Sequence, residues 1–141
     1  MGTRQMTICP KCDWDPDVAY KVVFEHTFTD ALLSVNKLKG NYRGARFAYK
    51  KYKQRWIDSF LSERSMLAIK GAFYRGFITR LYVKPCRPLD LENLVGGCKP
   101  LVDALKKADI IPEDNPKVWR GYYFQQASEF EGCTVRVERL I

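Results

Sequence analysis

Four aromatic residues recur at spacings of three and four in the middle of the chain: Tyr49, Tyr52, Trp56 and Phe60. This period places them on one face of a helix, which we predict to run from about residue 43 to residue 62. A face of large aromatic rings has to be buried against another layer of structure. We therefore interpret the stripe as core, and not as a platform on which nucleic-acid bases stack.

The segments around this helix have the composition of β-strands. Residues 20–28 and 77–84 are rich in β-branched and aromatic side chains, and the second run ends at Pro85. Two closing strands are predicted at about 118–127 and 133–141, joined by a turn into a C-terminal hairpin. Residues 66–74 are ambiguous between a helix tail and a short extra strand.

A second helical stripe is formed by apolar residues at positions 94, 95, 98, 101, 102 and 105. Pro100 lacks an amide hydrogen and is comfortable only in a first turn, so we expect the regular helix at about 98–108, after a tight lead-in at Gly96 and Gly97. The element order is then β-α-β-α-β-β. It predicts one α+β domain over residues 1–141, with a mixed sheet, helices packed on it and an irregular segment at 1–17.

The chain of 141 residues carries 24 Lys and Arg against 16 Asp and Glu, a formal charge of +8. Nucleic acid is the leading partner for so basic a protein, and an anionic membrane surface is the alternative. There is no apolar run of membrane-spanning length and no signal-peptide region. We therefore expect a cytoplasmic protein without a membrane partner, with its five cysteines as reduced thiols.

Eight basic residues and no acidic residue lie between Lys37 and Arg55. This run is typical of a loop and helix that bind DNA phosphates, with salt-dependent affinity because each contact releases counterions. The alternative is a solvated face on a basic protein. The candidate DNA-binding residues are Lys37, Lys39, Arg43, Arg46, Lys50 and Lys53.

Acidic residues gather in a later segment of this basic chain. Asp90 and Glu92 are two apart, so on an extended strand they share one face and repel each other unless a cation lies between them. Glu113 and Asp114 follow the second helix, where they would close a metal site or simply form a turn. Mg²⁺ held by a few carboxylates supplies an activated water and charge neutralisation, which phosphodiester hydrolysis needs.

Lys99 and Asp103 are four residues apart, so a helix places them on one face. Lys99 would bring positive charge to the scissile phosphate or stabilise the attacking hydroxide. The alternative is a simple intrahelical ion pair between the two side chains.

Three segments of the chain match one motif: Asp90-Leu91-Glu92-Asn93-Leu94, then Lys99-Pro100-Leu101-Val102-Asp103-Ala104-Leu105, then Ile111-Pro112-Glu113-Asp114. Together they resemble the RusA family of Holliday junction resolvases of phages and prophages. The resemblance implies a homodimeric Mg²⁺-dependent endonuclease, with Mn²⁺ as a substitute, that acts in DNA recombination and repair. It would make paired symmetric nicks in four-way DNA junctions inside a bacterial or phage-infected cell. A branched-structure or flap-cutting specificity on the same chemistry is a close variant. The implied metal-binding and catalytic carboxylates are Asp90, Glu92 and Asp114, with Lys99 as the catalytic cation and Asp103 and Glu113 as support.

The chain departs from the family pattern at Glu92, where the family usually has Asp, and about three extra residues precede Lys99. Two other functions remain open. One is a structure-specific DNA-binding protein whose acidic cluster is not catalytic. The other is a zinc-stabilised interaction module built on Cys9 and Cys12, although a tetrahedral site needs two further ligands.

Overall fold

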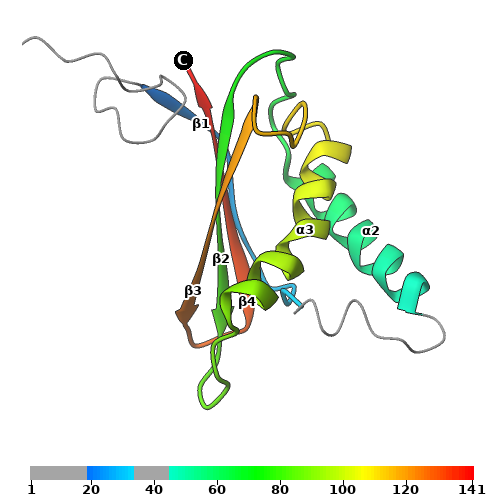
Figure 1. The fold of residues 1–141 in the computed structure, drawn as a ribbon, viewed down its shortest axis with the longest axis vertical. Helices are drawn as coiled ribbons and strands as arrows, with labels where there is room; N and C mark the ends of the chain where they lie inside the picture. The colour runs from blue at the N-terminus through cyan, green and yellow to red at the C-terminus, as the bar shows by residue number, and fades with distance from the viewer. Residues whose placement is uncertain (1–18, 34–44) are drawn as a thin grey trace, which may run out of the picture.

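The computed structural model describes residues 19–33 and 45–141 (Figure 1). The predicted irregular segment at 1–17, with Cys9 and Cys12, lies outside this part of the chain. The described elements follow the order β1 (Tyr20–Phe28), α2 (Ala45–Glu63), β2 (Tyr74–Tyr82), α3 (Leu91–Lys107), β3 (Trp119–Ala127) and β4 (Gly132–Leu140). The predicted α+β class and the order β-α-β-α-β-β are confirmed.

The four strands form one mixed sheet in the order β1-β4-β2-β3. β4 is antiparallel to both β1 and β2, whereas β3 is parallel to β2. The predicted C-terminal hairpin is therefore wrong, because β2 lies between β3 and β4. The reason is the crossover through α3, which returns the chain to the end of the sheet where β2 begins. β3 therefore runs parallel to β2 and forms an edge of the sheet.

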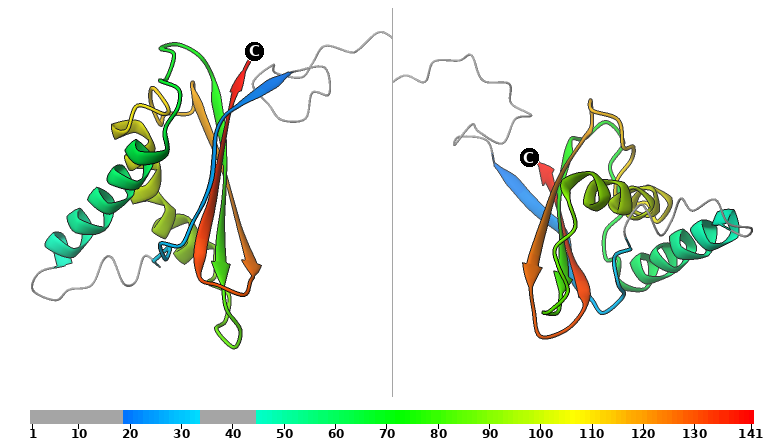
Figure 2. Two further views of the ribbon diagram at one scale, coloured as in Figure 1. Left: turned by 180° about the vertical axis from the view of Figure 1, so that it is seen from behind. Right: turned by 60° about the horizontal axis from the view of Figure 1, so that its bottom comes forward.

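Both helices pack on the same face of the sheet (Figures 1 and 2). The aromatic stripe of α2 is core, as predicted: Trp56 and Phe60 are almost fully buried. Their rings lie 5.4 and 5.5 Å from the ring of Phe28 in β1, in edge-to-face arrangements. Burying side chains of this size stabilises the fold by roughly 1.5–3 kcal/mol each.

Helix α3 begins seven residues earlier than predicted, at Leu91 instead of residue 98, so that Gly96, Gly97 and Pro100 all lie inside it. Pro100 in a helix interior costs about 3 kcal/mol and deprives the Gly96 carbonyl of its usual donor. Packing offsets this cost, since α3 buries Leu94, Cys98, Leu101 and Leu105 among other side chains. Tertiary packing has overridden the local preferences of glycine and proline.

The ambiguous segment at 66–74 contains no extra strand, since it is irregular until β2 begins at Tyr74. The chain turns there at Gly71, which has a positive φ of 88°. Neither α2 nor α3, the helices in the described ranges, has the length and apolar character to cross a membrane.

Candidate functional site

Asp90 is the N-cap of α3 and does not lie on a strand. Its Oδ1 accepts a hydrogen bond from the backbone N–H of Asn93 at 2.8 Å, and its Oδ2 accepts one from Asn93 Nδ2 at 3.0 Å. Glu92 lies exposed in the first helical turn. Positions two apart in a helix differ in direction by about 200°, so the predicted common strand face for Asp90 and Glu92 is wrong.

The loop before Asp90 is anchored to the sheet by Gln125 of β3. Gln125 accepts a hydrogen bond from the Leu89 N–H at 2.8 Å and donates one to the Leu89 carbonyl at 2.7 Å. Arg80 of β2 donates to the same Gln125 oxygen at 3.0 Å. The ends of β2 and β3 therefore position the start of α3, a role for Arg80 and Gln125 that the sequence did not reveal.

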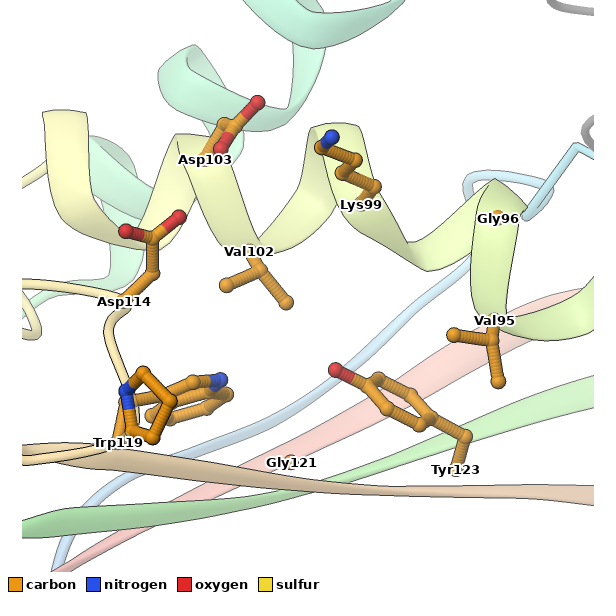
Figure 3. Close-up of a pocket in the computed structure, with 10 residues that line it drawn as sticks. Val95, Gly96, Lys99, Val102, Asp103, Asp114, Trp119, Gly121 and Tyr123 are labelled. Atoms are coloured by element: carbon orange, nitrogen blue, oxygen red, sulfur yellow. The ribbon is translucent and has the colours of Figure 1, made fainter.

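A pocket of about 380 Å³ lies between α3 and β3 (Figure 3). Its rim carries three predicted site residues: Lys99 and Asp103 from α3, and Asp114 from the loop before β3. As predicted, Lys99 and Asp103 occupy one helical face. The apolar part of the lining comes mostly from Val95, Gly96, Val102, Pro116, Trp119, Gly121 and Tyr123.

Two aromatic side chains form the floor of this pocket. A Cβ on Gly76 would lie only 2.1 Å from the Trp119 ring, and one on Gly121 only 2.3 Å from the Tyr123 hydroxyl. Both rings therefore occupy space that only glycine leaves open. Burial raises the pKa of Tyr123 to about 12, and the nearby negative charge of Asp114 contributes to the shift. The alternation of Trp119, Gly121 and Tyr123 along β3 was the sequence signal for this floor.

Asp114 and Glu113 both lie beside Lys106 of α3. The ammonium is 3.7 Å from Asp114 Oδ1 and 4.0 Å from Glu113 Oε1. Ion pairs as exposed as these contribute about 0–1 kcal/mol, so a stronger cation would displace Lys106 at little cost. Asp114 is thus both part of the pocket rim and available to another positive partner.

The two groups of carboxylates lie at opposite ends of α3. Asp103 lies thirteen positions after Asp90, which corresponds to about 20 Å along a helix. Asp114 lies at the Asp103 end, beside Lys106. Mg²⁺ requires its ligand oxygens at about 2.0–2.1 Å, so one ion cannot reach both groups within one chain. In the described ranges, no three His, Cys, Asp or Glu side chains form a metal site.

The predicted DNA-binding run is only partly described. Lys37, Lys39 and Arg43 lie outside the described residues, and the side chain of Arg46 is not described although its backbone is in α2. Lys50 is exposed on α2 and Lys53 is half-buried. These two lysines are therefore the described members of the predicted phosphate-binding surface.

In comparisons with known proteins, no family model, no curated protein and no solved structure matches this chain. The fold is that of a small α+β protein with both helices on one face of a mixed sheet. Its site combines a charged pocket rim with a capped helix start at the other end of α3.

Proposed function

We propose that this protein is a Mg²⁺-dependent endonuclease of the RusA type, with Mn²⁺ as a substitute, that resolves four-way DNA junctions as a homodimer. The observation that carries the proposal is the distribution of charge along α3. Asp90 and Glu92 stand at its start, and Lys99, Asp103 and Asp114 surround the pocket farther along. This combination of carboxylates and a lysine is suited to phosphodiester hydrolysis.

The separation of the carboxylates supports a site shared between two chains. If two copies of α3 pack antiparallel about a two-fold axis at Lys99, residue 92 of one chain is level with residue 106 of the other, because each is seven positions from 99. Lys106 lies 3.7 Å from Asp114. Such a dimer brings Asp90 and Glu92 of one chain to Asp114 of the partner subunit, twice over.

The surface of α3 is suited to such packing. Leu91 is 72% exposed and Val95 is 39% exposed, and Val95 borders the apolar wall of the pocket. Gly96, next to Val95, has no side chain and permits close approach of a second helix. We take Leu91 and Val95 as part of the contact surface in the proposed dimer.

In the shared site, Asp90 and Glu92 of one chain and Asp114 of the other would hold the metal ion. Mg²⁺, when bound, supplies an activated water and neutralises charge on the phosphate. Lys99 provides a further positive charge at the dimer axis, between the two sites. Lys50 and Lys53 of α2 would bind flanking phosphates, and this binding weakens as salt concentration rises.

A non-catalytic, structure-specific DNA-binding protein is the second candidate. It is favoured by Glu92, whose side chain is one methylene longer than the Asp of the family pattern, since metal sites tolerate little displacement of a ligand. Such a DNA-binding protein would keep the basic surface and the dimer but would not hydrolyse DNA.

Synthetic four-way junctions incubated with the protein and Mg²⁺ distinguish the two candidates. We expect paired symmetric nicks from the native protein and none from Asp90→Asn or Asp114→Asn. Both variants should bind junctions as tightly as the native protein or more tightly, because each removes negative charge near a polyanion. Native protein that binds junctions but cuts them with neither Mg²⁺ nor Mn²⁺ would establish the DNA-binding function.

A further inference from the structure

The sheet face opposite the helices is not covered by any helix or strand of the described chain (Figure 2). The strand register shows which side chains share it. One row across the sheet contains Arg136, Phe77 and Tyr122, and the next row contains Thr134, Thr79 and Phe124. Three aromatic side chains, Phe77, Tyr122 and Phe124, therefore lie together on a sheet face that no described helix or strand covers.

The aromatic members of this face form a parallel set. The rings of Phe77 and Tyr122 are 5.3 Å apart and inclined by 15°, and those of Phe77 and Phe124 are 6.4 Å apart and inclined by 14°. Tyr122 and Phe124 belong to β3, the edge strand, and Phe124 is 48% exposed. The nearly parallel rings of Phe77, Tyr122 and Phe124 could therefore stack against a planar group bound at this edge of the sheet.

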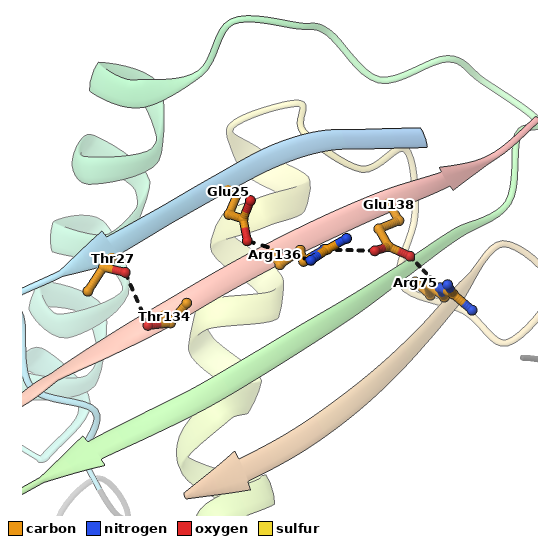
Figure 4. A network of polar contacts seen from close by, with 6 residues as sticks. All are labelled: Glu25, Thr27, Arg75, Thr134, Arg136 and Glu138. Atoms are coloured by element: carbon orange, nitrogen blue, oxygen red, sulfur yellow. Dashed lines mark hydrogen bonds and ion pairs between the residues drawn. The ribbon is translucent and has the colours of Figure 1, made fainter. Parts of the chain in front are cut away.

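Arginine and glutamate side chains lie beside the rings. Glu138, only 5% exposed, accepts a hydrogen bond from Arg75 Nε at 2.7 Å and forms an ion pair with Arg136 Nε at 2.7 Å. The Arg136 guanidinium also lies 3.8 Å from Glu25 (Figure 4). The positive charges of Arg75 and Arg136 are therefore matched by the negative charges of Glu138 and Glu25. Arg120, exposed on β3 and paired in register with Arg75, adds further positive charge to this face.

We propose that this uncovered face of the sheet binds single-stranded DNA, with bases stacked against Phe77, Tyr122 and Phe124 and a backbone phosphate bound by Arg120. Aromatic rings beside basic side chains are the combination that binds unpaired strands without sequence preference. A second copy of the chain is the other candidate occupant, and the sedimentation measurement below distinguishes it from DNA. This site is separate from the α3 site and does not depend on nuclease activity.

The test uses the full-length protein without divalent metal and a fluorescent oligothymidylate, with binding measured by anisotropy. We expect Phe124→Leu to weaken binding about fivefold or more, since base stacking on an aromatic ring contributes roughly that factor or above. Phe124→Tyr should bind like the native protein because it keeps the ring. Leu67→Ala, a change at an exposed apolar residue in the loop between α2 and β2, is the matched control and should have no effect.

Two further comparisons decide between stacking and other modes of binding. An abasic oligonucleotide of equal length keeps the phosphates but has no bases for any of the three rings, so the native protein should bind it at least as weakly as Phe124→Leu binds oligothymidylate. Arg120→Gln should reduce the slope of log affinity against log salt by about one ion, or roughly 0.7 for a single strand. Equal affinity for the abasic and normal strands, or unchanged affinity in Phe124→Leu, overturns the proposal. A dimer that dissociates in Phe124→Leu during sedimentation would instead identify the face as a contact between copies.

Discussion

Both carboxylate oxygens of Asp90 accept hydrogen bonds from Asn93, one from its backbone N–H at 2.8 Å and one from its side-chain amide at 3.0 Å. This pair begins α3 and sets Asp90 at the helix terminus. The length of the helix then determines how far Asp90 lies from the pocket at Asp114. That distance keeps Asp90 and Asp114 of one chain from sharing a metal ion, and the proposed two-fold dimer would bring Asp90 of one chain to Asp114 of the partner subunit.

A mixture of two inactive variants should recover cleavage if the site is shared. Asp90→Asn and Asp114→Asn are each expected to be inactive as homodimers. In a mixed dimer, one site receives both substitutions and the other receives neither. Random mixing in equal amounts should restore about a quarter of the native sites, which cut as single nicks. Nicking of a junction labelled on each strand measures this.

The control for that mixture is Asp90→Asn combined with the double variant Asp90→Asn/Asp114→Asn. No pairing of these chains contains Asp90, so no cleavage is expected. If the native protein cuts junctions but the first mixture does not, the active site is formed within one chain.

Substitutions of Asp90 should separate its capping role from its role in the site. Asn caps a helix about as well as Asp, whereas Ala loses the cap at a cost of about 1 kcal/mol. We therefore expect Asp90→Asn to leave the free energy of unfolding nearly unchanged and Asp90→Ala to lower it by about that amount. Urea denaturation followed by circular dichroism measures both. A larger loss in Asp90→Asn than in Asp90→Ala would contradict the N-cap.

Substitution of Gly76 should disturb the floor of the pocket. An alanine Cβ there would lie 2.1 Å from the Trp119 ring, which is mostly buried and has little room to move. Overpacking of this kind costs about 1–3 kcal/mol, so Gly76→Ala should unfold at a lower urea concentration. Addition of Trp119→Leu to Gly76→Ala should cost less than the sum of the two single changes. Strict additivity would show that the ring does not oppose the new methyl group.

Tyr52 should make stability depend on pH in the alkaline range. Burial raises its pKa from 10.0 to about 12, and its hydroxyl accepts a hydrogen bond from the Leu33 N–H at 3.0 Å. The folded state therefore holds this proton more tightly than the unfolded state. The resulting stability is fully present below pH 10 and is lost as the pH rises from 10 towards 12.

Tyr52→Phe provides the control for this titration, since it removes the ionisable group and keeps the ring. Buried Cys98 and Cys133, whose pKa values burial also raises, titrate in both proteins. Denaturation at a series of pH values should show a shallower alkaline loss of stability in Tyr52→Phe. Equal slopes in the two proteins would mean that the Tyr52 hydroxyl ionises as readily when folded as when unfolded.

The sequence predicted those features of the fold that depend on local periodicity. The bounds of β1, residues 20–28, were predicted as observed, and α2 was predicted to within two residues at its start and one at its end. The aromatic stripe at Tyr52, Trp56 and Phe60 was correctly predicted to be core. A helix repeats every 3.6 residues and a strand every two, so these patterns are legible without tertiary contacts.

The candidate site was predicted less well. Lys99 and Asp103 share a helical face and, with Asp114, line one pocket. Asp90 and Glu92 do not join them in one chain, because the segment expected to be an extended strand forms the first turn of α3. Gly96, Gly97 and Pro100 predicted that the helix begins near residue 98, because glycine and proline disfavour a helix interior. The burial of apolar side chains of α3 stabilises the longer helix despite these residues.

The sequence by itself determined the order of strands and helices, the aromatic face of α2 and the basic character of the protein, since these follow from residue spacing and charge. Only the tertiary structure decided that β4 lies between β1 and β2, that α3 continues through Pro100, and that the acids stand about 20 Å apart. Strand partners and helix ends are chosen by contacts between distant segments. The free energy gained from those contacts is larger than the helix or strand propensity of a short local segment.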